Sequence, residues 1–194
     1  MNAAGRFVTL EGIEGVGKTT QVARLSAAMN ARAIAHVVTR EPGGTPLAES
    51  IRQIVLTARD ETLPPTAELL LMFAARAQNV EQWILPALQQ GTIVISDRFT
   101  DSSIAYQGAG RGLGRNTVLE LDRIACRGLV PDLTICIDLD TETGLARALA
   151  RGGMETRLEE QAIEFHHKVR EAYHELARCE PQRARHLRAW GNGR

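Results

Sequence analysis

The sequence predicts an α/β fold, a three-layer α/β/α arrangement around a parallel central sheet of about five strands. Strand-like and helix-like segments alternate along the chain, which is typical of βαβ units in a parallel sheet. The segments 92–96 (TIVIS) and 133–138 (LTICID) are almost continuously apolar, as strands covered on both faces are. With 194 residues, the chain is long enough for one compact domain, so we expect residues 1–194 to form a single domain.

The expected elements follow one another with short connections. Strands are expected at 6–11, 35–39, 92–96 and 133–138, with at most a short further strand near the C-terminal end. Helices are expected at 18–31, 47–56, 116–126, 141–151 and 161–179, and a long helical segment at 66–90 that bends near Pro86. Thr141 is the expected N-cap of its helix. The polar, glycine-rich stretch 107–114 is expected to be a loop.

Charge and cysteine content exclude several classes of protein. Lys plus Arg and Asp plus Glu total 23 each, whereas a general nucleic-acid-binding protein carries an excess of basic charge, so no nucleic-acid partner is expected. The three cysteines show no CxxC spacing, which favours reduced thiols over metal ligands or disulfides. We see no signal peptide and no apolar segment of membrane-spanning length, so we expect a soluble, cytoplasmic protein without a membrane partner.

Residues 12–19 fit the phosphate-binding pattern G-x-x-x-x-G-K-[ST] at every fixed position. Glycines let the backbone curl so that successive N–H groups converge on one anion, and the helix that follows adds the positive end of its dipole. An expected strand precedes this P-loop and an expected helix follows it, which is the context that the motif requires. We therefore expect ATP to bind at Gly12, Ile13, Glu14, Gly15, Val16, Gly17, Lys18, Thr19 and Thr20, with Lys18 reaching the β- and γ-phosphates.

A Mg²⁺ site is expected beside the P-loop. The Thr19 hydroxyl is one ligand, and Asp97, at the tip of the strand 92–96, would hold the ion directly or through water. Asp97 could also cap the following helix, and the two roles can coexist. No His/Cys cluster or Ser-His-Asp arrangement in the sequence competes with this site, and the adjacent His166 and His167 are expected to face solvent.

A P-loop alone does not name the acceptor, because motors, GTPases and nucleotide kinases share it. Further segments resemble bacterial thymidylate kinase in order and spacing: 39–45 (TREPGGT), 73–78 (FAARAQ), 97–99 (DRF) running on to 105–108 (AYQG), and 131–134 (PDLT). The resemblance covers about residues 6–180. It implies that ATP and dTMP are converted to ADP and dTDP, for dTTP biosynthesis, by direct in-line transfer with Mg²⁺, in a homodimer.

The resemblance also implies a set of residues for dTMP. Arg98 would bind its phosphate, Arg76 would hydrogen-bond the thymine carbonyl, and Tyr106 would lie against the deoxyribose and crowd out a 2′-hydroxyl. The aromatic residue that stacks on thymine in many relatives is replaced, which leaves two candidates for that position, Met72 and Phe73. The full expected set is Glu14, Glu41, Pro42, Met72, Phe73, Arg76, Arg98, Ser102, Ser103, Tyr106 and Gln107.

Arginines flank the glycine pair 152–153, in a segment (about 147–159) that resembles the family's lid. The family supplies a catalytic arginine either from the P-loop or from the lid. Because Gly15 and Val16 occupy the P-loop position, the chain resembles the second design, with Arg147, Arg151 and Arg157 around the hinge. The expected catalytic residues are therefore Lys18, Arg98, Arg151 and Arg157, with the two lid arginines unranked.

Two other functions remain open at this point, a kinase for another nucleotide and a P-loop switch with little turnover. Arg76 and Tyr106 disfavour the first, and the second phosphate-binding segment at 97–98 disfavours the second. The C-terminal residues depart from the family pattern, which ends in a strand, a loop that touches adenine and a final helix. Only a short strand is expected here, and a lower affinity for ATP is a hypothesis that follows from this difference.

Overall fold

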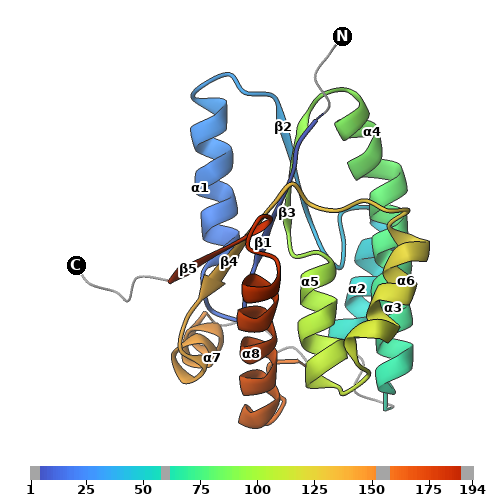
Figure 1. Cartoon of the computed structure of the whole chain (residues 1–194), viewed down its shortest axis with the longest axis vertical. Coiled ribbons are helices and arrows are strands. Elements are labelled where there is room, and N and C mark those ends of the chain that lie inside the picture. The colour runs from blue at the N-terminus through green and yellow to red at the C-terminus, as the bar shows by residue number, and fades with distance from the viewer. Residues whose placement is uncertain (1–4, 58–61, 152–157, 189–194) are drawn as a thin grey trace.

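A computed structural model of the chain describes residues 5–57, 62–151 and 158–188. At its centre lies a five-stranded sheet in the order β2-β3-β1-β4-β5, and every neighbouring pair of strands is parallel (Figure 1). The strands are β1 (Phe7–Glu11), β2 (His36–Arg40), β3 (Ile93–Asp97), β4 (Leu133–Asp138) and β5 (Ala184–Arg188). The predicted parallel sheet is confirmed, and β5 is the short C-terminal strand that the sequence allowed.

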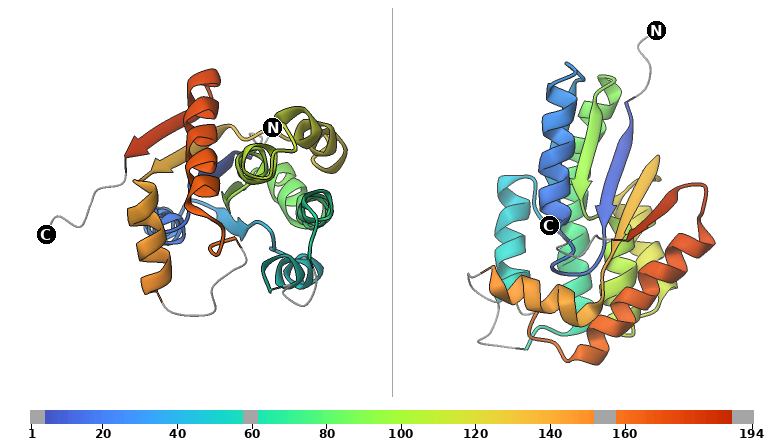
Figure 2. Two further views of the ribbon diagram at one scale, coloured as in Figure 1. Left: turned by 90° about the horizontal axis from the view of Figure 1, so that it is seen from below. Right: turned by 90° about the vertical axis from the view of Figure 1, so that its left-hand side faces the viewer.

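Helices cover both faces of the sheet, as the end-on view in Figure 2 shows. Helix α1 (Lys18–Asn30) packs against β1, β2 and β3 on one face, while α8 (Ile163–Cys179) packs against β4 and β5 on the other. The remaining α-helices are α2 (Pro46–Thr57), α3 (Pro65–Asn79), α4 (Leu85–Gln89), α5 (Thr100–Ser103), α6 (Arg115–Ala125) and α7 (Thr141–Ala150). Within the described ranges, none of the helices combines the length and apolar character that crossing a membrane requires.

The core fills the space between these layers. Phe7 and Leu10 of β1, Val94 and Ile95 of β3 and Val169 of α8 are almost completely buried. Each such side chain stabilises the fold by about 1.5–3 kcal/mol relative to an exposed position. This packing fixes the strand ends, and the loops at the carboxyl edge of the sheet start from a rigid base.

The long helical segment predicted at 66–90 is present but has three parts. Helix α3 runs into a π-helix, η1 (Val80–Ile84), before α4 completes the segment. Pro86 stands at the start of α4 and has no N–H to donate to the preceding turn, where its ring would also crowd the carbonyl four residues earlier. The wider π-turn lies beside it, so the predicted bend is a π-bulge rather than a simple kink.

The loop predicted at 107–114 is wrong for its first half. A π-helix, η2 (Ile104–Gly110), continues α5 there, and only the residues that follow form a turn. A side chain at Gly110 would collide with the Phe165 ring of α8. Gly110, one of the glycines that suggested a loop, therefore permits close packing of η2 on α8, which is a tertiary effect that local propensity does not report.

The cap predicted for α7 is also wrong. Asp140, not Thr141, is the N-cap, and its carboxylate accepts a hydrogen bond from the Thr143 N–H at 3.1 Å. The Thr141 hydroxyl is buried within the first turn of the helix. An aspartate caps well at this position because it adds a charge that favours the helix dipole.

The strand ends converge at one edge of the sheet. The register pairs Leu10 and Arg40 with Asp97, so β1, β2 and β3 end side by side. In parallel α/β sheets, ligands bind outside the carboxyl ends of the strands, where the loops from neighbouring strands diverge. The P-loop, the turn after β2 and the turn after β3 all leave from this edge.

Candidate active site

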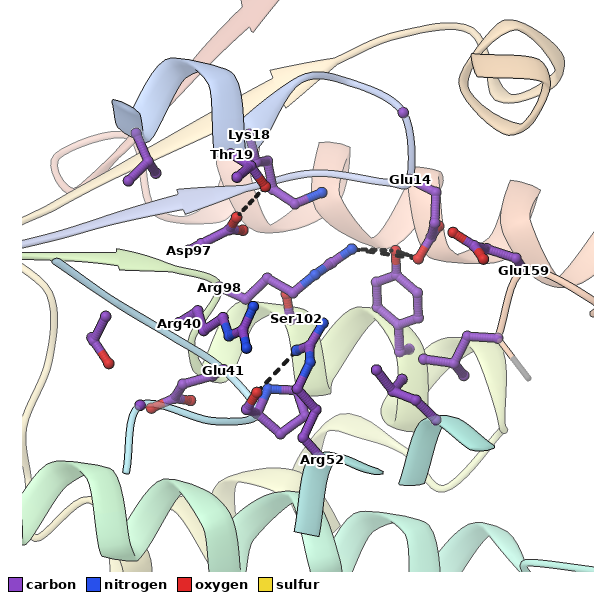
Figure 3. Close-up of a pocket in the computed structure, with 18 of the residues that line it drawn as sticks. Glu14, Lys18, Thr19, Arg40, Glu41, Arg52, Asp97, Arg98, Ser102 and Glu159 are labelled. Carbon is purple, nitrogen blue, oxygen red and sulfur yellow. Dashed lines mark hydrogen bonds and ion pairs between the residues drawn. The ribbon is translucent and has the colours of Figure 1, made fainter. Parts of the chain in front are cut away.

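The carboxyl edge of the sheet opens into a cavity of about 700 Å³ (Figure 3). It brings together most of the predicted site residues: Glu14, Gly15, Gly17, Lys18, Thr19, Thr20, Glu41, Pro42, Met72, Asp97, Arg98, Ser102, Tyr106, Gln107 and Arg151. Other predicted residues do not line it, namely Gly12, Ile13, Val16, Phe73, Arg76 and Ser103. Arg157 lies outside the described residues.

The P-loop joins β1 to α1 in a curled backbone. Gly15 and Gly17 have φ values of +69° and +92°, which side-chain-bearing residues rarely adopt. The Lys18 ammonium donates to the carbonyl oxygens of Gly12 (2.9 Å) and Ile13 (2.7 Å) and thus lies folded over the loop. Burial, with the charge of Arg98 nearby, lowers the pKa of Lys18 to about 8. An anion bound in the loop would compensate the buried ammonium for the water contacts that it has lost.

A hydroxyl and a carboxylate meet at the start of α1. The Thr19 hydroxyl donates to Asp97 Oδ2 at 2.9 Å, across the gap between the P-loop helix and the end of β3 (Figure 3). Both groups are oxygen ligands, which Mg²⁺ prefers, and both face the cavity. The pair is therefore chemically suited to a magnesium ion that also contacts phosphates in the loop.

Arg98 follows β3 and reaches back under the P-loop. Its Nη1 donates to Gly12 O (3.1 Å), Ser102 Oγ (3.1 Å) and Tyr173 Oη (3.2 Å). Its Nη2 donates to Tyr106 Oη at 3.1 Å and lies 3.4 Å from Glu14 Oε1. The Lys18 ammonium donates to the same Gly12 carbonyl oxygen, and Figure 3 shows the two cationic groups lying side by side. Two positive groups therefore share one cavity.

Glu11, at the end of β1, holds the Arg98 turn from beneath, and sequence reasoning missed it. Its fully buried carboxylate accepts from Phe99 N (2.7 Å), Ser102 Oγ (2.5 Å) and Tyr173 Oη (3.0 Å). Burial and the charge of Asp101 raise the pKa of Glu11 to about 7. The only sequence signal is a charged residue at the end of an otherwise apolar strand.

Arg76 lies beneath the cavity rather than in its lining. Its Nε donates to Glu41 Oε2 at 2.5 Å, and its Nη2 donates to Phe99 O and to Ser103 Oγ. Its Nη1 is buried and has no hydrogen-bond partner among the described residues. Such an unpaired donor costs about 1–3 kcal/mol unless a ligand satisfies it.

The two candidates for stacking on a base occupy different places. The Phe73 ring packs against the Arg76 guanidinium, 4.5 Å from the ring centroid, and does not reach the cavity. Met72 lines the cavity. A flexible, polarisable thioether side chain thus stands where a flat ring could have been.

Two acceptor atoms at the cavity accept no hydrogen bond from the described residues. Gln107 donates its Nε2 to Glu68 Oε1 at 2.8 Å, which leaves the buried Gln107 Oε1 unpaired. Glu14 accepts the Tyr106 hydroxyl at 2.7 Å through Oε1, while its Oε2 accepts no hydrogen bond and lies 3.6 Å from His166 Nδ1. Burial opposes ionisation of Glu14, but the nearby His166, Arg98 and Lys18 outweigh it and lower its pKa to about 2. The site therefore offers one amide acceptor and one charged acceptor to a ligand.

The pair His166 and His167 divides between core and solvent. His167 is about half exposed, as predicted, but His166 is fully buried and the prediction that it faces solvent is wrong. Its ring packs edge-on against Phe165, and its Nδ1 lies 3.6 Å from Glu14 Oε2. Adjacent helical positions point to different faces, and the face of α8 that carries His166 is turned toward the P-loop.

Two further arginines line the cavity and were not predicted. Arg52 of α2 donates from Nη1 to Pro42 O at 2.9 Å, and Arg40 at the end of β2 is paired with Glu49. Burial and the neighbouring Arg40 lower the pKa of Arg52, with a contribution from Arg98. This concentration of positive charge suits a phosphate group. The detectable signal was Arg52 on the helix directly after the segment 39–45.

Two arginines of the segment that was predicted to form a lid, Arg147 and Arg151, reach the cavity from α7 and its end. Arg151 lies 3.6 Å from Glu159, which also lines the cavity. Arg147, one helical turn earlier, lines the cavity and has no ion-pair partner among the described residues. A carboxylate partner is therefore present for Arg151.

A phosphate-binding loop and a second arginine-rich pocket that open into one cavity define a P-loop nucleotide kinase, in which a phosphoryl group passes between two bound anions. Comparison with known proteins shows to which family of nucleotide kinases the chain belongs. The family model described as thymidylate kinase matches residues 10–190. The chain therefore belongs to the thymidylate kinase family.

Individual relatives support this family assignment. The thymidylate kinase of Pelobacter propionicus is 51% identical over 184 residues, covering 92% of this chain and 84% of that protein. That of Teredinibacter turnerae is 48% identical over 179 residues, covering 92% and 87%. The crystal structure of thymidylate kinase from Ehrlichia chaffeensis matches with a TM-score of 0.80 and 32% identity, covering 99% of this chain and 91% of that one.

Proposed function

We propose that this chain transfers the γ-phosphoryl group of ATP to dTMP and forms ADP and dTDP by direct in-line attack of the acceptor phosphate oxygen. The observation that carries the proposal is the single cavity that both Lys18 and Arg98 line (Figure 3). Membership of the thymidylate kinase family supports the choice of dTMP as acceptor. No covalent intermediate is required, because the reaction needs only that two phosphates be held close together in line.

The donor side is the P-loop. We propose that its converging N–H groups and Lys18 bind the β- and γ-phosphates of ATP, and that Thr19 and Asp97 hold Mg²⁺. The fit is chemical: the Thr19 hydroxyl and the Asp97 carboxylate are adjacent oxygen ligands at the mouth of the loop. When bound, Mg²⁺ supplies positive charge that offsets the charge on the phosphates. Lys18 stabilises the charge that develops as the phosphoryl group moves.

The acceptor side is the arginine-rich pocket. We propose that Arg98 binds the dTMP phosphate and that Arg52 assists it, since both guanidinium groups line the cavity. Oε2 of Glu14, which accepts no hydrogen bond from the described residues, supports a hydrogen bond to a sugar hydroxyl, and Tyr106, held against Glu14, would exclude a 2′-hydroxyl. These contacts would place the phosphate oxygen of dTMP opposite the γ-phosphate.

The base side follows from the unpaired polar groups. Thymine presents a carbonyl acceptor beside an N–H donor, and the site holds a donor, Arg76 Nη1, and an acceptor, Gln107 Oε1, that lack partners among the described residues. We propose that these two atoms hydrogen-bond the edge of the base. Ser103 would hold Arg76 in place, and Ser102 would hold Arg98. Met72 lines the cavity and is the residue that we propose covers the ring. Buried polar groups left unmatched by another base would be costly.

The lid would complete the site on closure. We propose that Arg151 stabilises the charge on the transferred phosphoryl group, with Arg147 beside it, and the role expected for Arg157 stays a prediction. Arg151 is largely exposed while its neighbour Glu159 is mostly buried, so the guanidinium is free to move onto a phosphate. An arginine that acts only after closure delays phosphoryl transfer until both nucleotides are bound and water is excluded.

The test of the proposed function is a coupled assay of ADP release with ATP and a panel of nucleoside monophosphates. We expect dTMP to give the highest kcat/KM, and dTDP to accumulate in proportion to ADP. Preference for dGMP or UMP would overturn the assignment of the acceptor. ATP binding without formation of any nucleoside diphosphate would show a P-loop switch instead of a kinase.

We also propose that the protein is a homodimer, formed through the face that carries α3, η1 and α6. Large apolar side chains are exposed there, including Leu70 (52%), Trp83 (47%) and Ile124 (66%), and α3 packs beside α6 (Figure 1). A second copy of this chain would bury them by an isologous contact. Ile124→Glu should convert the dimer to monomer in analytical ultracentrifugation, whereas Leu149→Glu, on exposed α7, should not. A wild-type monomer would contradict the proposal.

A cytoplasmic location is the last part of the proposal. The thiols of Cys126, Cys136 and Cys179 are unpaired, and a reducing compartment would keep them so. Supplies of ATP and dTMP for such a reaction are also expected in that compartment.

A further inference from the structure

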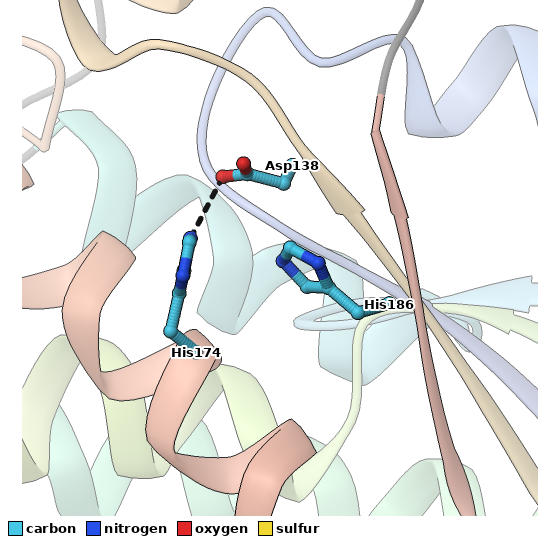
Figure 4. Close-up of side chains that lie close together, drawn as sticks. All are labelled: Asp138, His174 and His186. Carbon is cyan, nitrogen blue, oxygen red and sulfur yellow. Dashed lines mark hydrogen bonds and ion pairs between the residues drawn. The ribbon is translucent and has the colours of Figure 1, made fainter.

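A second cluster of ligating side chains lies outside the nucleotide cavity, although the sequence showed none. Asp138 at the end of β4, His174 of α8 and His186 of β5 place one ligand atom each within 4.8 Å of one another (Figure 4). His174 Nε2 lies 3.0 Å from Asp138 Oδ1, and the two imidazole rings have centroids 4.7 Å apart. None of the three lines the cavity described above.

Strand register and helix spacing bring these residues together. The parallel register aligns His186 with Cys136, two residues before Asp138, so Asp138 and His186 point to the same face of the sheet. Helix α8 covers that face, and His174 lies on it one turn after Arg170, which also reaches Asp138. The three residues are 12 or more positions apart in sequence, which explains why no spacing motif announced them.

We propose that Asp138, His174 and His186 form a binding site for a divalent transition-metal ion, with Zn²⁺ as the representative case. Two imidazole nitrogens and one carboxylate oxygen are ligands that favour zinc, cobalt and nickel ions over magnesium. Three protein ligands would leave a position for water. The proposed site is thus chemically different from the oxygen ligands at Thr19 and Asp97.

Arg170 supports the carboxylate without excluding an ion. Its Nε and Nη2 donate to Oδ1 (2.7 Å) and Oδ2 (3.0 Å) of Asp138, so one lone pair on each oxygen is used. An ionised carboxylate can accept at about four positions. The position that now contacts His174 is where a metal ion would bind, between the carboxylate and this ring. The guanidinium acts as an outer partner that fixes the orientation of a ligand. Asp140 and Glu142 are close enough to offset its positive charge.

A small movement of one ring closes the site. Nitrogen and oxygen ligands about 2.0–2.2 Å from a tetrahedral zinc ion are roughly 3.4 Å apart. The ligand atoms of the cluster, which lie within 4.8 Å of one another, must therefore move closer together to bind the ion. His186 is exposed on β5, a strand with one neighbour in the sheet, and its side chain has room to rotate toward the other two. A bound ion would then tie α8 and β5 to β4 and stabilise the edge of the sheet. This inference does not depend on the identity of the nucleotide acceptor.

The experiment uses the full chain after treatment with a chelator, with Mg²⁺ in excess to occupy oxygen-ligand sites. Co²⁺ is added as a spectroscopic substitute for Zn²⁺, and visible absorption is recorded beside calorimetric titration with Zn²⁺ itself. We expect one ion per chain. Zinc at about 100 times its dissociation constant should raise Tm by about 5–10 °C.

Matched variants test whether these histidines are the metal ligands. His174→Ala and His186→Ala should each abolish the Co²⁺ bands and the Tm shift, while His167→Ala, the same change at an exposed position of α8, should keep both. Circular dichroism confirms that each variant is folded. Absence of zinc binding to the wild-type chain would overturn the proposal. So would binding that survives in either cluster variant or disappears in His167→Ala.

Discussion

Arg98 is the residue on which the acceptor side depends. Its backbone has a φ of +75°, an unusual value for a side chain of this size, and its N–H donates to Leu10 O at 3.0 Å. Its guanidinium contacts side chains from the P-loop, from η2 and from α8, so it is fixed before any ligand arrives. A preorganised guanidinium loses little entropy when it binds a phosphate.

Replacing this group tests the acceptor assignment. Arg98→Ala should weaken dTMP binding by about 100-fold, because it removes charge-assisted hydrogen bonds to the phosphate, and should change ATP binding by less than about fivefold. Calorimetric titration with each nucleotide alone separates the two effects. Arg98→Lys, which keeps the charge but not the fork, should be intermediate. Equal weakening of both nucleotides would show that Arg98 serves the donor.

The buried Lys18 gives the donor side a pH dependence. Its pKa is lowered to about 8, and phosphate binding favours the protonated form, so ATP affinity should fall as the pH rises above about 8, approaching tenfold per pH unit. Calorimetry from about pH 7 to about pH 10 measures this slope. Lys18→Arg, whose guanidinium stays charged, should bind ATP with little pH dependence over the same range. A flat profile for the wild-type protein would contradict the role given to the ammonium.

At this scale the sequence predicted the residues that carry motifs and missed those that act through burial. Gly12–Thr19 and Asp97–Arg98 are short contiguous patterns with a strand before them, so their place was predictable. Glu11, Arg52 and His166 are single polar residues in apolar or helical surroundings. The hydrogen-bond partners of Glu11 are 88 or more positions away, and Glu14, which His166 approaches, is 152 positions away, so only tertiary packing shows them.

Among the elements, the P-loop and α7 make a contact that determines the shape of the site. A side chain on Gly15 would collide with the carbonyl of Gly144 in the first turns of α7. The backbone of the loop therefore packs directly on the helix that carries Arg147 and Arg151. Through this contact, the P-loop and the first turns of α7 pack backbone against backbone.

This contact predicts a specific difference between two glycine substitutions. Gly15→Ala and Gly128→Ala both place a side chain at positive φ, but Gly128 has open space around it. We expect Gly128→Ala to cost about 1–2 kcal/mol of unfolding free energy from backbone strain alone, and Gly15→Ala to cost more and to weaken ATP binding. Urea denaturation and ATP titration measure the two effects. Equal losses of stability with unchanged ATP affinity would rule out the close approach.

The regular elements were predictable, and their exceptions have local causes. Alternating apolar strands and amphipathic helices gave nearly the observed bounds, because burial on one or both faces is written into the residue pattern. The segment 107–110 was misassigned because its glycines are poor helix formers, whereas Gly110 leaves the space in which η2 packs on Phe165. The sequence predicted a bend near Pro86 but not the π-helix η1 before it, because a proline indicates a break in helical hydrogen bonding and not the width of the adjacent turn.

For the whole molecule, the order β2-β3-β1-β4-β5 is what places the two phosphate pockets on one cavity. Strand β3 lies between β1 and β2, so the turn that carries Arg98 lies beside the P-loop on one side and the segment 40–44 on the other. The chain order alone does not give this arrangement, because β3 is inserted from about 50 residues further along. Resemblance to the thymidylate kinase family was what located Arg98 and the lid arginines from sequence.

The most direct test of this arrangement is the affinity of one molecule that joins adenosine and thymidine through a chain of phosphates. If the Lys18 and Arg98 pockets face each other across a single cavity, both halves bind at once, and calorimetry should show binding about 100-fold or more tighter than ATP or dTMP alone. The gain should vanish in Arg98→Ala. Affinity no greater than that of ATP would mean that the two pockets cannot be occupied by phosphates in line, and would contradict the proposed transfer.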